Sequence, residues 1–306
     1  MAGVSVLLNQ EGGRAMRFGI VVNKDKDPGY AFTKHATEVM RARGCEVVLD
    51  PAYAETELAD VQGVILDEYK NCDILISMGG DGTFLRTAHK HLDSKVPLIG
   101  VNLGSIGFMT EISKEDFEDA VDRLIEGKYT LETRTQLDVT LMSEDGTVRE
   151  HGVCLNDAVV ARGANLHVVT LDLLIDHDHV ERLSGDGVIL STATGCTAYC
   201  LAAGGPIVKP DLDICMVTPI CPHTLHNRTY IVSGDSSVEL IIERFSEPPI
   251  LSLDGRQNIE LALHDRIVVR KSEVGVVVAK LGYKNFYQTV RQKIRARGSF
   301  YEDGKK

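Results

Sequence analysis

The sequence lacks the features that mark several large classes of protein. No apolar run approaches the roughly 18 residues that a membrane-spanning helix needs. The residues up to Arg14 include a short apolar patch without a basic segment before it, so we expect no signal peptide and a cytoplasmic location. Seven cysteines are scattered without a CxxC pair. This spacing disfavours a disulfide framework and a zinc knuckle, and it indicates reduced thiols.

Positive charge is also scarce. Lys and Arg number 33 against 44 Asp and Glu, which gives a net charge of −11. A protein that coats nucleic acid needs a basic face, so we expect no nucleic acid and no membrane as partner. The negative net charge does not exclude small anionic ligands, because local N–H groups and a few cationic side chains can outweigh it. Neither GxxxxGK[ST] nor GxGxxG after a strand occurs, which disfavours P-loop and standard Rossmann mechanisms.

The 306 residues suggest about two domains. Strand-like and helix-like runs alternate over residues 17–133, which predicts an N-terminal, Rossmann-like α/β domain with a parallel sheet that binds a nucleotide. Short β-rich runs then follow at close spacing, which predicts a mostly-β domain over 134–282. The segment 283–306 returns to helical spacing, and we expect it to pack back on the first domain. Residues 1–16 are interpreted as an N-terminal extension.

The spacing of apolar and polar residues also predicts individual helices, strands and turns. Apolar spacing predicts helices over Tyr30–Arg43, Phe84–His91 and Lys114–Gly127. The β-rich run Val153–Arg162 predicts a single strand. Asp176–His179 (DHDH) places its two histidines on opposite faces of a strand, so we expect a solvated hairpin tip and no metal ligands there.

The turn Gly79–Thr83 (GGDGT) lies where a predicted strand meets a predicted helix. Its three glycines allow positive φ and close backbone approach to a ligand, and successive N–H groups there suit phosphate oxygens. A carboxylate inside a phosphate site repels the ligand. Asp81 is therefore better suited to accept a proton from a sugar hydroxyl, or to reach a magnesium ion through water. The alternative is a plain glycine-rich turn with a solvated aspartate.

Other polar segments are weaker signals when taken alone. Asn156 and Asp157 in a β-rich region fit either a ligand-binding pair or an Asx turn. Ser191–Tyr199 (STATGCTAY), preceded by Gly185–Gly187, offers hydroxyl donors without bulk, as a sugar or phosphate surface requires. Any turn of small residues shares that property. Thr218–Leu225 (TPICPHTL) is expected to be a rigid loop that presents one histidine.

Together these segments resemble the NAD kinase family, in its bacterial type. GGDGT also occurs in phosphofructokinases and lipid kinases, whereas the longer elements are more specific. The resemblance covers about residues 17 to 290. The segments follow the family's order: GGDGTFLRTA (79–88), NLGSIGFMTE (102–111), LNDAVVARG (155–163), GDGVILSTATGCTAYCLAAGGPIV (185–208) and TPICPHTL (218–225).

The resemblance implies a kinase that transfers the terminal phosphate of ATP, with Mg²⁺, to the 2′-hydroxyl of the adenosine ribose of NAD, giving NADP. It implies that Asp81 is the catalytic proton acceptor and that the mostly-β domain binds the dinucleotide. It also implies a homo-oligomer, either dimer or tetramer, in which Tyr199 reaches a neighbouring subunit. The binding residues it implies are Gly82, Arg86, Asn156, Asp157, Asp186, Thr197, Ala198, Tyr199, Cys200, Leu201 and Ala202.

Their implied roles differ. Asn156 and Asp157 would hold adenosine groups, and Asp186 would lie near the nicotinamide end. Arg86 would offset phosphate charge, and the segment 197–202 would line the dinucleotide site.

The chain also departs from the family pattern. The usual TPTGSTAYSLS reads TATGCTAYCLA here, with Ala193, Cys196 and Cys200 at changed positions, and the usual DG-Gln reads Asp254-Gly255-Arg256. Because S–H is a poor donor, affinity or nucleotide preference could shift while the reaction class stays. Two other readings stay open: a different GGDGT-type kinase that acts on a lipid or sugar, and a non-catalytic dinucleotide sensor. The sequence leaves open ATP or polyphosphate as donor, and NAD or NADH as acceptor.

Overall fold

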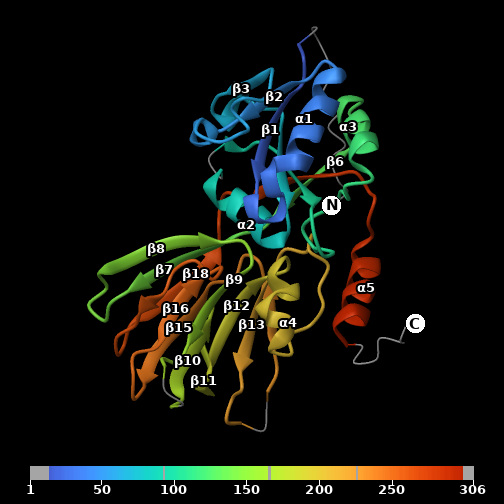
Figure 1. Ribbon diagram of the computed structural model, residues 1–306. Coiled ribbons are helices and arrows are strands. Elements are labelled where there is room, and N and C mark those ends of the chain that lie inside the picture. Colours follow the sequence, from blue (N-terminus) through green and yellow to red (C-terminus); the bar gives the residue numbers. More distant parts are fainter. Residues whose placement is uncertain (1–13, 92–93, 165–166, 225–226, 299–306) are drawn as a thin grey trace. The chain divides into compact units, whose positions relative to one another are not determined.

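The computed structural model describes residues 14–91, 94–164, 167–224 and 227–298 (Figure 1). The chain divides into two compact units. Unit 1 comprises Met1–Thr133 together with Val276–Lys306, and unit 2 is Arg134–Gly275. The predicted fold class is confirmed, since unit 1 contains a sheet with parallel strands and unit 2 contains antiparallel sheets. No helix in the described ranges is long and apolar enough to cross a membrane.

Unit 1 is built on a seven-stranded sheet in the order β3-β2-β1-β4-β5-β19-β6. The strand β19 comes from the C-terminal part of the chain and pairs parallel with β5. The expected boundary at residue 282 therefore differs from the structure, because 276–282 belongs with unit 1. The strands are β1 (Arg17–Val22), β2 (Glu46–Leu49), β3 (Val64–Leu66), β4 (Ile74–Gly79), β5 (Leu98–Asn102), β6 (Thr130–Arg134) and β19 (Val276–Lys280); the helices are α1 (Ala31–Ala42), α2 (Asp81–Lys90), α3 (Phe117–Ile125) and α5 (Phe286–Gly298).

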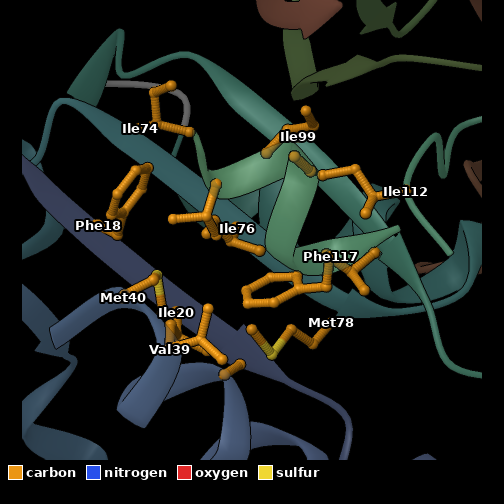
Figure 2. Close-up of a cluster of buried hydrophobic side chains, with 14 of the residues drawn as sticks. Phe18, Ile20, Val39, Met40, Ile74, Ile76, Met78, Ile99, Ile112 and Phe117 are labelled. Atoms are coloured by element: carbon orange, nitrogen blue, oxygen red, sulfur yellow. The ribbon is translucent and has the colours of Figure 1, made fainter. Parts of the chain in front are cut away.

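Helices cover both faces of this sheet. All six residues of β4 are buried, as is typical of a central parallel strand. Ile76 and Met78 join the cluster that contains Met40 of α1 and Phe117 of α3, as Figure 2 shows. Ser77, between them, points to the opposite face and accepts a hydrogen bond from Thr87 of α2 at 3.3 Å. The helix α2 and the Gly-rich turn before it are thus fixed against the strand's second face.

Unit 2 consists of two six-stranded sheets with a shared core between them. A second cluster lies on the outer face of the sheet that contains β12, where the short helix α4 (Tyr199–Ala202) packs. The first sheet runs β11 (Asp178–Gly185), β10 (Val169–Ile175), β15 (Val238–Arg244), β18 (Arg266–Lys271), β7 (Leu137–Met142), β8 (Val148–Cys154); the second runs β14 (Tyr230–Ser233), β13 (Ile214–Ile220), β12 (Gly187–Thr192), β9 (Asp157–Ala161), β16 (Ile250–Leu253), β17 (Ile259–Glu260).

The chain changes sheets at two points that carry predicted site residues. The single strand expected over Val153–Arg162 is wrong, because β8 ends at Cys154 in one sheet and β9 begins at Asp157 in the other. Asn156 lies in this crossing. Asp186 lies in the second one, between β11 and β12. The hairpin tip expected at 176–179 is confirmed, since Asp176 and His177 have φ of 51° and 71° between paired strands.

Candidate active site

The Gly-rich turn connects β4 directly to α2, with Asp81 as the first helical residue. None of Gly79, Gly80 and Gly82 adopts the positive φ that glycine allows. Neighbouring side chains lie so close to Gly79 and Gly80 that a Cβ at either position has no room. A Cβ on Gly79 would overlap Thr83, and one on Gly80 would lie 2.7 Å from the ammonium of Lys26. Because these glycines have no side chains, charged groups can approach the backbone of the turn closely.

The carboxylate of Asp81 is held by the backbone of a neighbouring loop. Its Oδ2 accepts the N–H of Phe108 at 2.8 Å, and its Oδ1 accepts the N–H of Met109 at 2.9 Å. A Cβ on Gly107 would overlap Oδ1, so only glycine leaves room for this arrangement. The side chain of Asp81 is 32% exposed and remains reachable from solvent. It is thus a fixed but accessible carboxylate.

Three cationic side chains surround the same turn. Lys26, from a short turn of 3-10 helix (Lys24–Lys26), has its ammonium over Gly80. Arg86 donates to Thr83 Oγ1 at 3.4 Å and lies beside the open surface of Gly82. Lys293 of α5 lies 3.3 Å from Asp81 Oδ2. Cations and backbone N–H groups at a helix N-terminus together suit a polyphosphate. The predicted residues Asp81, Gly82 and Arg86 are brought together, whereas Lys26, Gly107 and Lys293 were missed.

In unit 2, Asp254 organises the crossing that carries Asn156 and Asp157. It follows β16, and its carboxylate accepts the N–H groups of Leu155 at 2.7 Å, Asn156 at 2.8 Å and Asp157 at 2.9 Å. Its own N–H donates to the carbonyl of Asp157 at 2.9 Å. Asp254 has φ of +50°, a conformation that a short polar side chain tolerates. The sequence singled out this residue only as a departure from the family ending.

The two carboxylates of this crossing are coupled. Asp157 is only 6% exposed. Burial, and secondarily the negative charge of Asp254, raise the pKa of Asp157 to about 7. An ordinary aspartate is an acceptor at neutral pH, whereas Asp157 near its pKa also supplies a hydroxyl donor.

The segment Ser191–Ala202 lies directly against this crossing. Ser191 Oγ donates to the carbonyl of Asn156 at 3.2 Å, and Thr192 Oγ1 donates to that of Leu155 at 2.6 Å. A Cβ on Gly195 would overlap the Asn156 carbonyl, so the glycine permits the close contact. The small residues of this segment thus allow close packing against Asn156, in addition to any role in ligand binding.

The predicted residues 197–202 differ in exposure. Tyr199 is 46% exposed, and Ala198 and Ala202 are exposed, while Thr197 and Leu201 are half-buried. Cys200 is fully buried, with its sulfur 3.3 Å from Thr218 Oγ1. Its thiol is therefore an internal contact of unit 2, and only its backbone is a candidate for ligand binding.

Asp186 lies apart from Asn156. Its carboxylate accepts the guanidinium Nε of Arg162 at 2.8 Å. In the β9–β12 ladder Gly187 pairs with Ala161, and Ser191 pairs with Asp157. Asp186 and Asn156 each lie one residue beyond these pairs, at opposite ends of one ladder, so six residues of strand, or roughly 20 Å, separate them.

The loop predicted over 218–225 differs in part from the structure. The loop expected over Thr218–Leu225 is wrong for Thr218–Ile220, which forms the end of β13 because it pairs with β12. Leu225 lies outside the described residues. Within the described ranges, no group of three or more His, Cys, Asp or Glu side chains is arranged to hold a metal ion.

The protein thus combines a carboxylate at a Gly-rich strand–helix junction in unit 1 with an antiparallel β unit. Residues 18–129 match the ATP-NAD kinase N-terminal domain, and residues 155–281 match the ATP-NAD kinase C-terminal domain. The chain is 34% identical over 282 residues to the NAD kinase of Ruminiclostridium cellulolyticum, covering 92% of this chain and 98% of that protein. Over 287 residues it is 36% identical to the NAD kinase of Acetivibrio thermocellus, with the same coverage. The chain belongs to the ATP-NAD kinase family.

Solved structures agree with this assignment. The yeast NADH kinase complexed with NADH matches with a TM-score of 0.83 and 25% identity, covering 95% of this chain and 91% of that one. The NAD kinase of Archaeoglobus fulgidus in complex with ATP matches with a TM-score of 0.70 and 26% identity, covering 92% and 99%. The fold is thus that of enzymes crystallised with a dinucleotide or with ATP.

Proposed function

We propose that the protein transfers the γ-phosphate of ATP to the 2′-hydroxyl of the adenosine ribose of NAD, releasing ADP and NADP. The observation that carries this proposal is the Asp81 carboxylate, which is fixed by two backbone N–H groups yet accessible within a turn surrounded by cations. Phosphoryl transfer depends mainly on positioning and on neutralising phosphate charge. The family's relatives carry the same activity in their names.

Unit 1 supplies the donor side of the reaction. The backbone of the turn, with Lys26 and Arg86, would hold the triphosphate of ATP. Asp81 accepts the proton of the attacking hydroxyl as the new O–P bond forms, and the bond to ADP breaks. Mg²⁺ would arrive with ATP and neutralise its phosphate charge. Gly82, without a side chain, leaves room beside Asp81 for the acceptor ribose.

Unit 2 supplies the dinucleotide contacts. Asn156 offers an amide donor and an acceptor, and Asp157 offers an acceptor or a donor according to its protonation state, which suits ribose hydroxyls and a base edge. Asp186 would interact with the nicotinamide end. The separation of Asp186 from Asn156 along one β ladder supports this division, because a dinucleotide has two nucleosides that need polar partners at separate places.

The exposed part of the 197–202 segment fits a role in assembly. Tyr199 projects a large aromatic side chain into solvent beside exposed alanines. We expect a homo-oligomer, dimer or tetramer, in which Tyr199 reaches a neighbouring subunit's dinucleotide site. Specific activity should then fall when the protein is diluted below its dissociation constant. A monomer in sedimentation with full activity would contradict this arrangement.

The test of function uses purified protein with NAD, ATP and Mg²⁺, and it measures NADP with a dehydrogenase specific for NADP. Formation of NADP and ADP in equal amounts supports the proposal. Replacing ATP by polyphosphate, and NAD by NADH, identifies the preferred donor and acceptor. Phosphorylation of a lipid or free sugar without NADP formation would favour another GGDGT-type kinase. Dinucleotide binding without any turnover would favour a sensor.

A further inference from the structure

The C-terminal segment of the chain is fastened to the loop that holds Asp81. This loop donates the N–H groups of Phe108 and Met109 to the Asp81 carboxylate. A few residues later, the carboxylate of Glu111 is buried and contacts a different part of the chain. Its Oε1 accepts the backbone N–H groups of residues 281–283 at 3.1, 2.6 and 3.2 Å. One short loop therefore connects the candidate catalytic group with the start of the C-terminal segment.

Lys293 extends this connection to Asp81 itself. Its ammonium lies 3.3 Å from Asp81 Oδ2 and 4.1 Å from the ring centroid of Phe108. Its side chain is only 15% exposed, so water screens the pair less than a surface ion pair. Phe286 lies seven residues before Lys293, and thus on the same face of the helix, and its ring centroid is 6.4 Å from that of Phe108. The helix α5 thus contacts Phe108 at two of its residues.

These contacts leave Asp81 with a defined orientation. An ionised carboxylate has about four acceptor positions. Among the described residues, Phe108 and Lys293 donate to Oδ2, and Met109 donates to Oδ1. By this count one acceptor position, on Oδ1, has no donor among the described residues, and the side chain as a whole is 32% exposed. A substrate hydroxyl would therefore meet one acceptor in a fixed direction, which is what proton transfer requires.

We propose that Lys293 is a positioning residue for phosphoryl transfer, which acts through Asp81 by holding Oδ2 so that Oδ1 faces the incoming hydroxyl. This inference rests on the proposed function. The C-terminal helix is then part of the catalytic arrangement, although the two residues are 212 positions apart in sequence. The ammonium also offsets the charge of Asp81, so that the carboxylate repels the donor phosphates less.

The variant Lys293→Met removes the ammonium and keeps an unbranched side chain. We expect it to lower kcat about tenfold while KM for NAD changes less than about twofold, because a misdirected base affects the transition state and leaves dinucleotide binding intact. Lys293→Arg should recover most of the loss, since it restores a cation. Arg291→Met is the matched control on the same helix, where the side chain is exposed, and it should leave kcat unchanged. Circular dichroism and thermal melting verify that each variant is folded. If Lys293→Met does not fold, Lys293→Gln is measured in its place.

A double-mutant cycle distinguishes action through Asp81 from a general structural role. If Lys293 acts through Asp81, adding Lys293→Met to Asp81→Asn should not lower the residual kcat further. Equal proportional losses in both backgrounds would overturn the proposal, as would full activity of Lys293→Met. If the wild type phosphorylates NAD but the variants give either of these contradicting results, only the role of Lys293 is overturned. A wild type that phosphorylates no NAD overturns the proposed function and, with it, this inference.

Discussion

Two aspartates, one in each unit, occupy opposite kinds of surroundings. Asp81 of unit 1 is a third exposed and receives hydrogen bonds from two backbone N–H groups and an ammonium. Asp157 of unit 2 is buried, and its nearest charged neighbour is another carboxylate, Asp254. Burial, and secondarily the charge of Asp254, raise the pKa of Asp157 to about 7, whereas Asp81 is held by hydrogen-bond donors and stays accessible to solvent. The same residue type is thus prepared for two tasks by its neighbours.

We propose from this difference that unit 1 carries the chemistry and unit 2 the recognition of the dinucleotide. A carboxylate surrounded by donors remains an acceptor for a substrate proton. A carboxyl group that is neutral in part at physiological pH can donate a hydrogen bond to a bound nucleoside, which an ordinary aspartate does not. The predictions below separate the two tasks, beginning with the largest effect.

The amide of Asp81→Asn cannot accept a proton as a base. We expect kcat to fall by about 10²-fold or more, because a positioned base contributes about 10²–10⁴-fold. NAD affinity, measured by calorimetry, should stay within a few-fold of wild type. Turnover close to wild type would show that Asp81 does not act as the base.

Removing the acceptor that organises the Asn156–Asp157 crossing should destabilise unit 2. Asp254→Ala leaves three backbone N–H groups without their partner and places alanine at positive φ. We expect a loss of about 3 kcal/mol in the free energy of unfolding, with weaker NAD binding. Asp254→Asn, which retains one oxygen and tolerates the backbone conformation, should lose less. Equal stability of Asp254→Ala and wild type in urea unfolding would contradict this role.

The raised pKa of Asp157 makes stability depend on pH. Its pKa is about 7 in the folded chain, against roughly 3.9 for an ordinary aspartate in the unfolded chain. Between these values the folded state binds more protons, so the contribution of Asp157 falls as pH rises from about 4 to about 7 and is constant above that. Over the whole range the loss is on the order of 4 kcal/mol, of which about 3 kcal/mol falls between pH 5 and pH 8. Asp157→Asn should remove this component from urea unfolding measured at pH 5 and pH 8, while an identical pH dependence in both proteins would refute it.

Asn156→Ala tests recognition by unit 2 separately from donor binding. We expect NAD binding to weaken by about 1–3 kcal/mol, as for the loss of a buried hydrogen-bond partner. ATP affinity should change much less, because the triphosphate is assigned to the turn at 79–83. Calorimetry with each nucleotide measures both effects. Equal losses for NAD and ATP would mean that Asn156 is structural, as in a plain Asx turn.

Much of the fold could be predicted because it follows from local patterns. The buried strand β4 and the glycines after it are continuous in sequence, so the GGDGT turn was predicted at its observed strand–helix junction. The family assignment is confirmed because its motifs are long and keep their order. The α/β fold class is confirmed as well, since alternating strands and helices in unit 1 differ visibly from the close β runs of unit 2.

The contacts that orient the site could not be predicted, because they join distant segments. Asp254 binds backbone groups that lie 97 to 99 positions earlier, and backbone N–H groups have no sequence signature. The break at Asn156 was missed because both flanking strands are β-rich, and only their membership of different sheets separates them. Gly107 offered a signal within NLGSIGFMTE, although nothing in the sequence indicated that its missing Cβ makes room for Asp81.

The contrast between the two aspartates can be measured by carboxyl ¹³C NMR titration of protein labelled at aspartate. The account predicts one aspartate resonance with a midpoint of about 7, absent from Asp157→Asn. In Asp254→Asn this midpoint should move to lower pH without reaching the ordinary value, because burial is the larger cause and remains. If no aspartate titrates above about pH 5, Asp157 is an ordinary anion and the division of tasks between the two carboxylates is contradicted.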